Sequence, residues 1–107
     1  MNSKIQCSLV LAVVTALTPA VSFAQSTGEA VYKHKCLTCH GADGMAAAGI
    51  GKILKVKPVT DPAVKMYSRA EMINLTRTGV GRMQAYKGDL TDQQIKDSVD
   101  YFRSFLK

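Results

Sequence analysis

The feature that most limits how this chain can fold is a pair of closely spaced cysteines. Of the three cysteines in 107 residues, two lie in the segment Cys-Leu-Thr-Cys-His that runs from Cys36 to His40. A disulfide between Cys36 and Cys39 would close almost no loop, so it would stabilise a fold very little. The third cysteine, Cys7, lies near the N-terminus before an apolar run. A domain this small buries a modest share of its surface, so a bound cofactor would help it fold.

The N-terminal region has the order of a secretory signal. A short, positively charged start is followed by an apolar run over residues 9–17, and then by Ser22 and Ala24, small residues at the two positions that a signal peptidase reads. The run is too short for a bilayer, which needs about 20 apolar residues. We predict that residues 1–24 are a cleaved signal peptide. Residues 25–107 then form one exported, periplasmic domain without stable membrane insertion.

Three helix starts can be read from capping boxes, in which a Ser or Thr is followed three residues later by Glu or Gln. The pairs are Ser26 with Glu29, Ser68 with Glu71, and Thr91 with Gln94. They predict helices over residues 27–38, 69–78 and 92–106. The last of these carries an apolar stripe on one face, formed by Ile95, Val99, Phe102 and Leu106.

Glycine and proline interrupt the pattern between these helices. Four glycines between residues 41 and 51, with Pro58 and Pro62, predict one long loop, in which Asp61-Pro62 opens a short helical turn. Further glycines bound a second loop over residues 79–90. No stretch alternates as a strand does. We predict an all-α domain with three main helices and two long loops, and a flat ligand held between the loops would account for both.

The segment from Cys36 to His40 is a C-x-x-C-H motif, which indicates attachment of a c-type haem. The two thiols add to the haem vinyl groups as thioethers, and His40 can ligate the iron. A thioredoxin-like redox pair would need a βαβ context, which is not seen. A structural zinc site would need four ligands, and His34, Cys36, Cys39 and His40 are too crowded along the chain to supply them. We expect one covalently bound haem c, held by Cys36, Cys39 and His40.

With these motifs, residues 27–107 resemble a small bacterial class I cytochrome c. The resemblance rests on residues 28–44 around the cysteine motif, on Gly-Val-Gly-Arg-Met-Gln-Ala-Tyr at 79–86, and on the final helix from Leu90 to Phe102. It implies a class I cytochrome c-like fold, with three main helices and two long loops around one haem. It also implies that Met83 is the second axial ligand of the iron.

Other candidates for that ligand are His34, Met45, Met66 and Met72. His34 shares a helix with the attachment site, Met45 is too near His40 to reach around the ring, and Met72 is expected in the core. The family usually has a proline directly after the ligand methionine, and this chain has Gln84. A loop without that proline is expected to be less rigid.

The resemblance also suggests secondary contacts for the haem. Tyr101 matches a tyrosine that packs near the haem edge, and Arg77 and Arg82 are candidates to meet a propionate. We expect a backbone carbonyl in the loop over residues 44–58 to accept a hydrogen bond from His40, since iron-bound histidines usually have such a partner.

Ligation by His40 and Met83 is the arrangement of electron-transfer cytochromes c. We therefore predict a soluble periplasmic one-electron carrier, not an enzyme, that acts as a monomer with redox protein partners. The alternatives are a haem-bearing subunit of a larger oxidoreductase, and a haem enzyme or sensor with an open iron site. A formal charge of +6 suits partners with an acidic docking surface. No Lys/Arg run indicates nucleic-acid binding. The cations expected near the haem are Lys33, Lys35, Lys52, Lys55, Lys57, Arg82 and Lys87.

Overall fold

The computed structural model describes residues 12–17 and 27–107. The predicted signal peptide therefore lies largely outside the described residues, and its cleavage stays a prediction. Within the described part of the chain, no helix is both long enough and apolar enough to cross a membrane.

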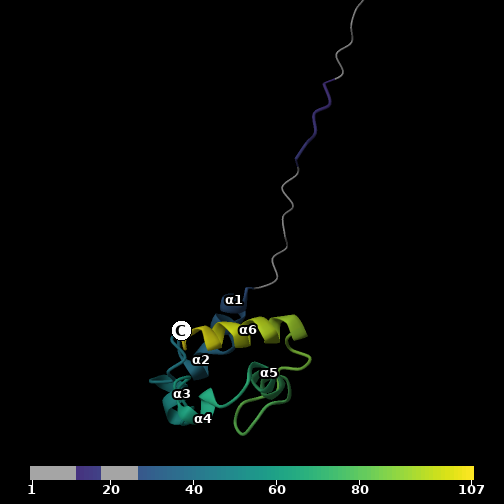
Figure 1. The fold of residues 1–107 in the computed structure, drawn as a ribbon. Helices are drawn as coiled ribbons and strands as arrows, with labels where there is room; N and C mark the ends of the chain where they lie inside the picture. Colours follow the sequence, from purple (N-terminus) through teal and green to yellow (C-terminus); the bar gives the residue numbers. More distant parts are fainter. Residues whose placement is uncertain (1–11, 18–26) are drawn as a thin grey trace, which may run out of the picture.

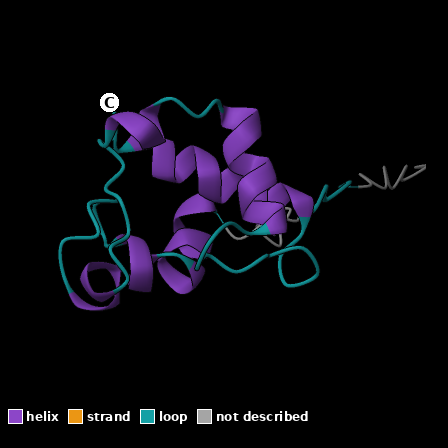
Figure 2. Cartoon of the chain, turned by 90° about the horizontal axis from the view of Figure 1, so that it is seen from below, coloured by secondary structure: helices purple, strands orange, loops and turns teal. Residues whose placement is uncertain are grey.

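Six helices, three of them short, make up the described domain (Figure 1). They are α1 (Gly28–Lys35), α2 (Leu37–His40), α3 (Gly49–Ile53), α4 (Pro62–Lys65), α5 (Arg69–Thr78) and α6 (Asp92–Ser104). Residues 27–107 contain no β-strand, only two isolated bridges, and long loops join the helices (Figure 2). The prediction of an all-α domain with three main helices is confirmed.

Two of the three predicted capping boxes are present. The hydroxyls of Ser68 and Thr91 each accept from the amide of the third helical residue, Glu71 or Gln94. The side chain of that residue in turn accepts from the amide of the capping Ser or Thr. The first box is wrong by one residue, because α1 is capped by Thr27, which accepts from the amide of Ala30 at 3.2 Å. Thr27 is as good a hydroxyl cap as Ser26, which lies outside the described residues.

The first long loop contains more helix than its glycines suggest. The helical turn at Asp61-Pro62 is confirmed as α4, with the Asp61 carboxylate accepting from the Ala63 amide at 2.8 Å. Helix α3 was not predicted, since Gly49 and Gly51 interrupt its pattern. Gly51 is required for packing, because a Cβ there would collide with the carbonyl of Cys39.

Helix α6 packs against both α1 and α5. Helix α1 lies against α6 (Figure 1), and a Cβ on Gly28 would collide with the Asp97 carbonyl, so Gly28 permits this close approach. Helix α5 runs antiparallel to α6, with an arginine-aspartate pair near each end. Arg69 meets Asp100 at 2.6 Å, and Arg77 meets Asp92 at 3.1 Å.

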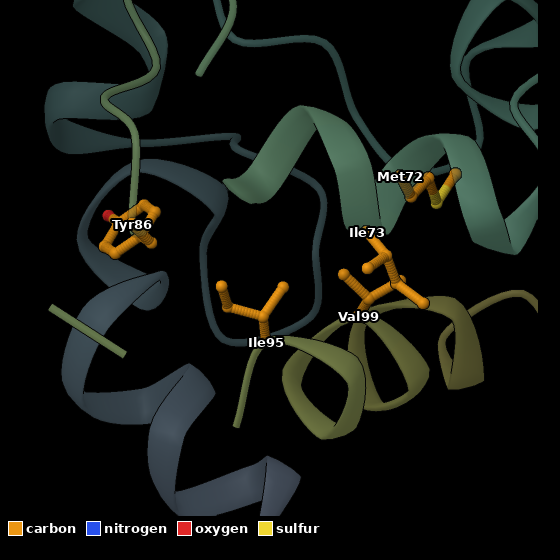
Figure 3. Close-up of a cluster of buried hydrophobic side chains, with 5 residues drawn as sticks. All are labelled: Met72, Ile73, Tyr86, Ile95 and Val99. Carbon is orange, nitrogen blue, oxygen red and sulfur yellow. The ribbon is translucent and has the colours of Figure 1, made fainter. Parts of the chain in front are cut away.

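The core lies between α5, α6 and the second loop. Its buried cluster, shown in Figure 3, consists of Met72, Ile73, Tyr86, Ile95 and Val99. The predicted stripe of the last helix therefore faces the core through Ile95 and Val99. Its last member, Leu106, does not: α6 ends at Ser104, and Leu106 lies beyond it, 38% exposed.

Candidate haem-binding site

An apolar cleft lies between the cysteine motif and the second loop. The interior of the cleft measures about 160 Å³. Side chains from α1, α2, α5, α6 and both long loops line it. They belong to Tyr32, Cys36, His40, Lys57, Val64, Tyr67, Met72, Leu75, Thr76, Val80, Met83, Ser98, Val99 and Phe102.

The cysteine motif forms one side of this cleft. Cys36 separates α1 from α2, and Cys39 and His40 lie on α2. Cys36 and His40 line the cleft, whereas Cys39 is half-buried beside it, and both thiols are free. The turn after the motif is fixed, because the buried Tyr32 hydroxyl donates to the Gly41 carbonyl at 2.6 Å.

Burial favours the neutral forms of two groups of the motif, His40 and Cys36. Burial lowers the pKa of His40, so its imidazole is neutral at neutral pH, which is the form that binds metals. Burial, with a smaller contribution from Cys39, raises the pKa of the Cys36 thiol to about 11. This side of the cleft therefore presents neutral groups to a ligand.

The imidazole of His40 is missing a partner. Its Nδ1 is buried and has no hydrogen bond, so the predicted bond to a carbonyl within residues 44–58 is not found. Some carbonyls of this loop accept backbone hydrogen bonds instead. The Gly44 carbonyl accepts from the Val59 amide, and the Gly51 carbonyl accepts from the Val56 amide. A buried, unpartnered ring nitrogen needs an explanation. An imidazole without a protein partner, in an apolar cleft beside two free thiols, fits a covalently bound haem whose iron takes a histidine ligand.

Met83 also lines the cleft, half-buried in the second loop. Its amide donates to the Val80 carbonyl at 2.9 Å, and the Val80 amide donates back at 3.0 Å. Met72 also lines the cleft, but its sulfur accepts from the Arg103 guanidinium at 3.9 Å. His34, Met45 and Met66 are exposed and do not line it.

The residues that line the cleft differ in part from those that the resemblance suggests near the haem. Tyr101 packs on Tyr32, with ring centroids 5.2 Å apart, and does not line the cleft. Its neighbour Phe102 does line the cleft. The rings of Phe102 and His40 meet edge to face, with their centroids 5.1 Å apart. The sequence predicts Phe102 on the apolar stripe of its helix. That stripe is the sequence pattern that could have indicated that Phe102 lines the cleft.

The cationic residue that lines the cleft also differs from the prediction. Arg77 is paired with Asp92, and neither Arg77 nor Arg82 lines the cleft. Lys57 is the charged side chain in the lining. Lys57 is one of the seven cations expected near the haem, and nothing in the sequence around it distinguishes it from the other six.

Comparisons with known proteins agree with this geometry. The family described as cytochrome c oxidase, cbb3-type, subunit III matches residues 23–102. Cytochrome c6 from Thermosynechococcus vestitus is 32% identical over 96 residues, which span 89% of this chain and 83% of that protein, and cytochrome c6 from Thermostichus vulcanus gives the same values. The solved structure of the KustC0563 c-type cytochrome superposes with a TM-score of 0.66 at 28% identity, covering 74% of this chain and 96% of that one.

These matches extend over the helices, both long loops and the cysteine motif. They agree in kind, since each relative is a c-type cytochrome, a class of electron carriers whose haem is bound covalently. The chain therefore belongs to the cytochrome c family, as a small monohaem electron-transfer protein with a covalently bound c-type haem.

Proposed function

We propose that this protein is an exported, freely diffusing one-electron carrier. In this proposal Cys36 and Cys39 hold the haem as thioethers, and His40 and Met83 are the two axial ligands. The observation that carries the proposal is that His40 and Met83 line the same apolar cleft from two different segments. No carboxylate is found among the residues that line it, so the cleft offers no acid or base of that kind to an open-site enzyme.

When bound, the haem supplies a one-electron couple. The chain's own part is to hold two neutral ligands in place and to exclude water. The backbone of His40 is fixed by a 2.8 Å bond from the Ala46 amide to its carbonyl, and that of Met83 by its two bonds to Val80. Ligands held in this way move little between redox states, which keeps the reorganisation small.

The charges around the cleft support an acidic partner. Lys33 is paired with Glu29 at 2.6 Å and Lys35 with Asp89 at 3.1 Å, so these two cations are partly neutralised. Within residues 27–107 no ion pair holds the other five, which all lie in the two long loops or on α3 within the first of them. These five are Lys52, Lys55, Lys57, Arg82 and Lys87. We propose that they form the docking face for an acidic redox protein.

A second candidate is favoured by the name of the matching family. That name is of a subunit of a cbb3-type oxidase, so this domain could serve inside a larger oxidoreductase. The two candidates differ in size under native conditions. A carrier elutes from a native periplasmic extract as a monomer, whereas a subunit elutes with its complex.

Carbon monoxide tests the ligation. With both axial positions filled, the ferrous spectrum of the wild type should not change when the gas is added. Met83→Ala opens one position, so this variant should bind carbon monoxide and serves as the positive control. Rapid binding by the wild type would contradict the carrier proposal and favour an open-site enzyme or sensor.

A further inference from the structure

The loop that carries Met83 is tied to the helix that leads into the cysteine motif. Tyr86, three residues after Met83, is 8% exposed and belongs to the buried core cluster. Its hydroxyl donates to the carbonyl of Lys35 at 3.0 Å. In Figure 3 this side chain reaches from the green loop toward the blue ribbon of the cysteine-motif region. Lys35 is the last residue of α1 and directly precedes Cys36.

A second contact joins the same two segments. The ammonium group of Lys35 lies 3.1 Å from a carboxylate oxygen of Asp89. Asp89 is itself held to the loop, because its amide donates to the Tyr86 carbonyl at 3.0 Å. One residue of α1 thus binds the loop through its carbonyl and through its side chain.

The position of the hydroxyl bond makes it effective. The last carbonyls of a helix have no partner within the helix, and the Tyr86 hydroxyl supplies one to Lys35. Burial raises the pKa of the Tyr86 phenol, so the hydroxyl keeps the proton that it donates. The Lys35–Asp89 pair is half-exposed, and such pairs contribute less than buried hydrogen bonds do.

We propose that Tyr86, Lys35 and Asp89 form a clasp that keeps the Met83 loop closed on the cleft. The three are positioning residues: they act on the iron ligand through the loop and do not touch it. This proposal rests on the axial role of Met83 given above. The clasp stiffens a loop in which Gln84 directly follows the methionine.

Tyr86→Phe tests the clasp, since it removes the hydroxyl and keeps the ring. The first measurement is amide hydrogen exchange in the haem-loaded protein, at Val80 and Met83. Loss of one hydrogen bond should speed exchange at these amides by roughly 2- to 10-fold, while amides of α6 keep their wild-type rates. Tyr101→Phe is the matched control, because among the described residues the Tyr101 hydroxyl has no hydrogen bond, and it should leave the loop unchanged. Asp89→Asn should show a smaller effect in the same direction.

The second measurement is displacement of Met83 by imidazole in the ferric protein, followed by loss of the long-wavelength sulfur-to-iron absorption band. Tyr86→Phe should bind imidazole tighter than the wild type, again by roughly 2- to 10-fold. Unchanged exchange at Val80 and Met83 in Tyr86→Phe would overturn the clasp. A wild-type ferric protein without the sulfur band would overturn Met83 ligation instead, and the exchange data would still decide whether the clasp holds the loop.

Discussion

Residues 36–40 and residues 79–90 supply the two sides of one cleft, but they are held in place by different means. The first segment is helical, and contacts from α1, α3 and α6 fix it: Tyr32 donates to Gly41, Gly51 packs on Cys39, and Phe102 packs on His40. The second segment is a loop. Its start is closed internally by the Val80–Met83 bonds. Further on, the amides of Tyr86 and Lys87 donate to carbonyls of α5, and the Tyr86 hydroxyl reaches back to Lys35.

This difference separates two tasks that a haem protein must perform. The helical side places two thiols and an imidazole at fixed spacing, which covalent attachment requires. In the proposed function the loop side supplies a single thioether, that of Met83, and its strength as a ligand would depend on how well the loop stays closed. Changes on the helical side should therefore affect whether haem is retained, and changes on the loop side should affect how the iron is ligated.

The largest effect is expected on the helical side. Replacing both Cys36 and Cys39 with alanine should abolish covalent attachment, because no other thiol lies near the cleft in the described part of the chain. Acid acetone should then extract the haem completely. Met83→Ala is the control, since it should keep the haem attached. Extraction of haem from the wild type would show that attachment is not covalent.

On the loop side, Met83→Ala should remove the ferric sulfur-to-iron band without loss of haem. The potential should fall by a sizeable part of the roughly 0.8 V range that axial ligands span. Met72→Leu is the matched control, because Met72 lines the same cleft with its sulfur turned to Arg103. Loss of the band in Met72→Leu but not in Met83→Ala would exchange the roles of the two methionines.

The same contrast shows what could be predicted from the sequence. The C-x-x-C-H motif identified the helical side by its chemistry, and the caps at Ser68 and Thr91 fixed the start of two helices, because both signals are local. Helix α3 was missed because the need for Gly51 arises from the Cys39 carbonyl, which the sequence alone does not bring near it.

Local sequence patterns also could not predict which of two neighbouring residues on α6 faces the cleft. Tyr101 and Phe102 differ by one helical position, and the rotation of α6 decides which of them faces the cleft. That rotation is set by packing against α1 and α5, including the contact of Gly28 with Asp97. Tyr86 ends the segment 79–86 on which the resemblance rests, but its bond to Lys35 depends on the tertiary fold.

Substitution of two glycines, Gly28 on α1 and Gly81 in the second loop, should lower the stability of the protein by smaller amounts and for different reasons. Gly28→Ala places a Cβ on the Asp97 carbonyl and forces α1 away from α6, which should cost about 1–3 kcal/mol of unfolding free energy. Gly81→Ala has open space around it, and its cost comes from the left-handed backbone at φ +54°, about 1 kcal/mol. Denaturant unfolding of the haem-loaded protein measures both.

A rescue variant separates the two causes. Asparagine tolerates the left-handed region, so Gly81→Asn should recover part of the stability lost in Gly81→Ala. No side chain can rescue position 28, because every one of them carries a Cβ. An equal loss in Gly28→Ala and Gly81→Ala, with no recovery by asparagine, would remove the distinction between packing on the helical side and backbone conformation on the loop side.

The smallest effect concerns the charges, which also differ between the two regions. Lys33 and Lys35 on α1 have acidic partners, whereas Lys52 and Lys55, in and just after α3, have no ion pair in residues 27–107. Unpaired cations in this loop, which lines the cleft through Lys57, should attract an anionic oxidant. Lys52→Gln with Lys55→Gln should slow oxidation by ferricyanide at low salt by roughly 2- to 4-fold, a small share of the 10–10³ that steering can supply. Added salt should reduce the difference.

Lys96→Gln with Lys107→Gln removes the same charge from α6 and the C-terminus, so it controls for net charge alone. If both double variants slow the reaction equally, position does not matter, and these loops are not the docking face.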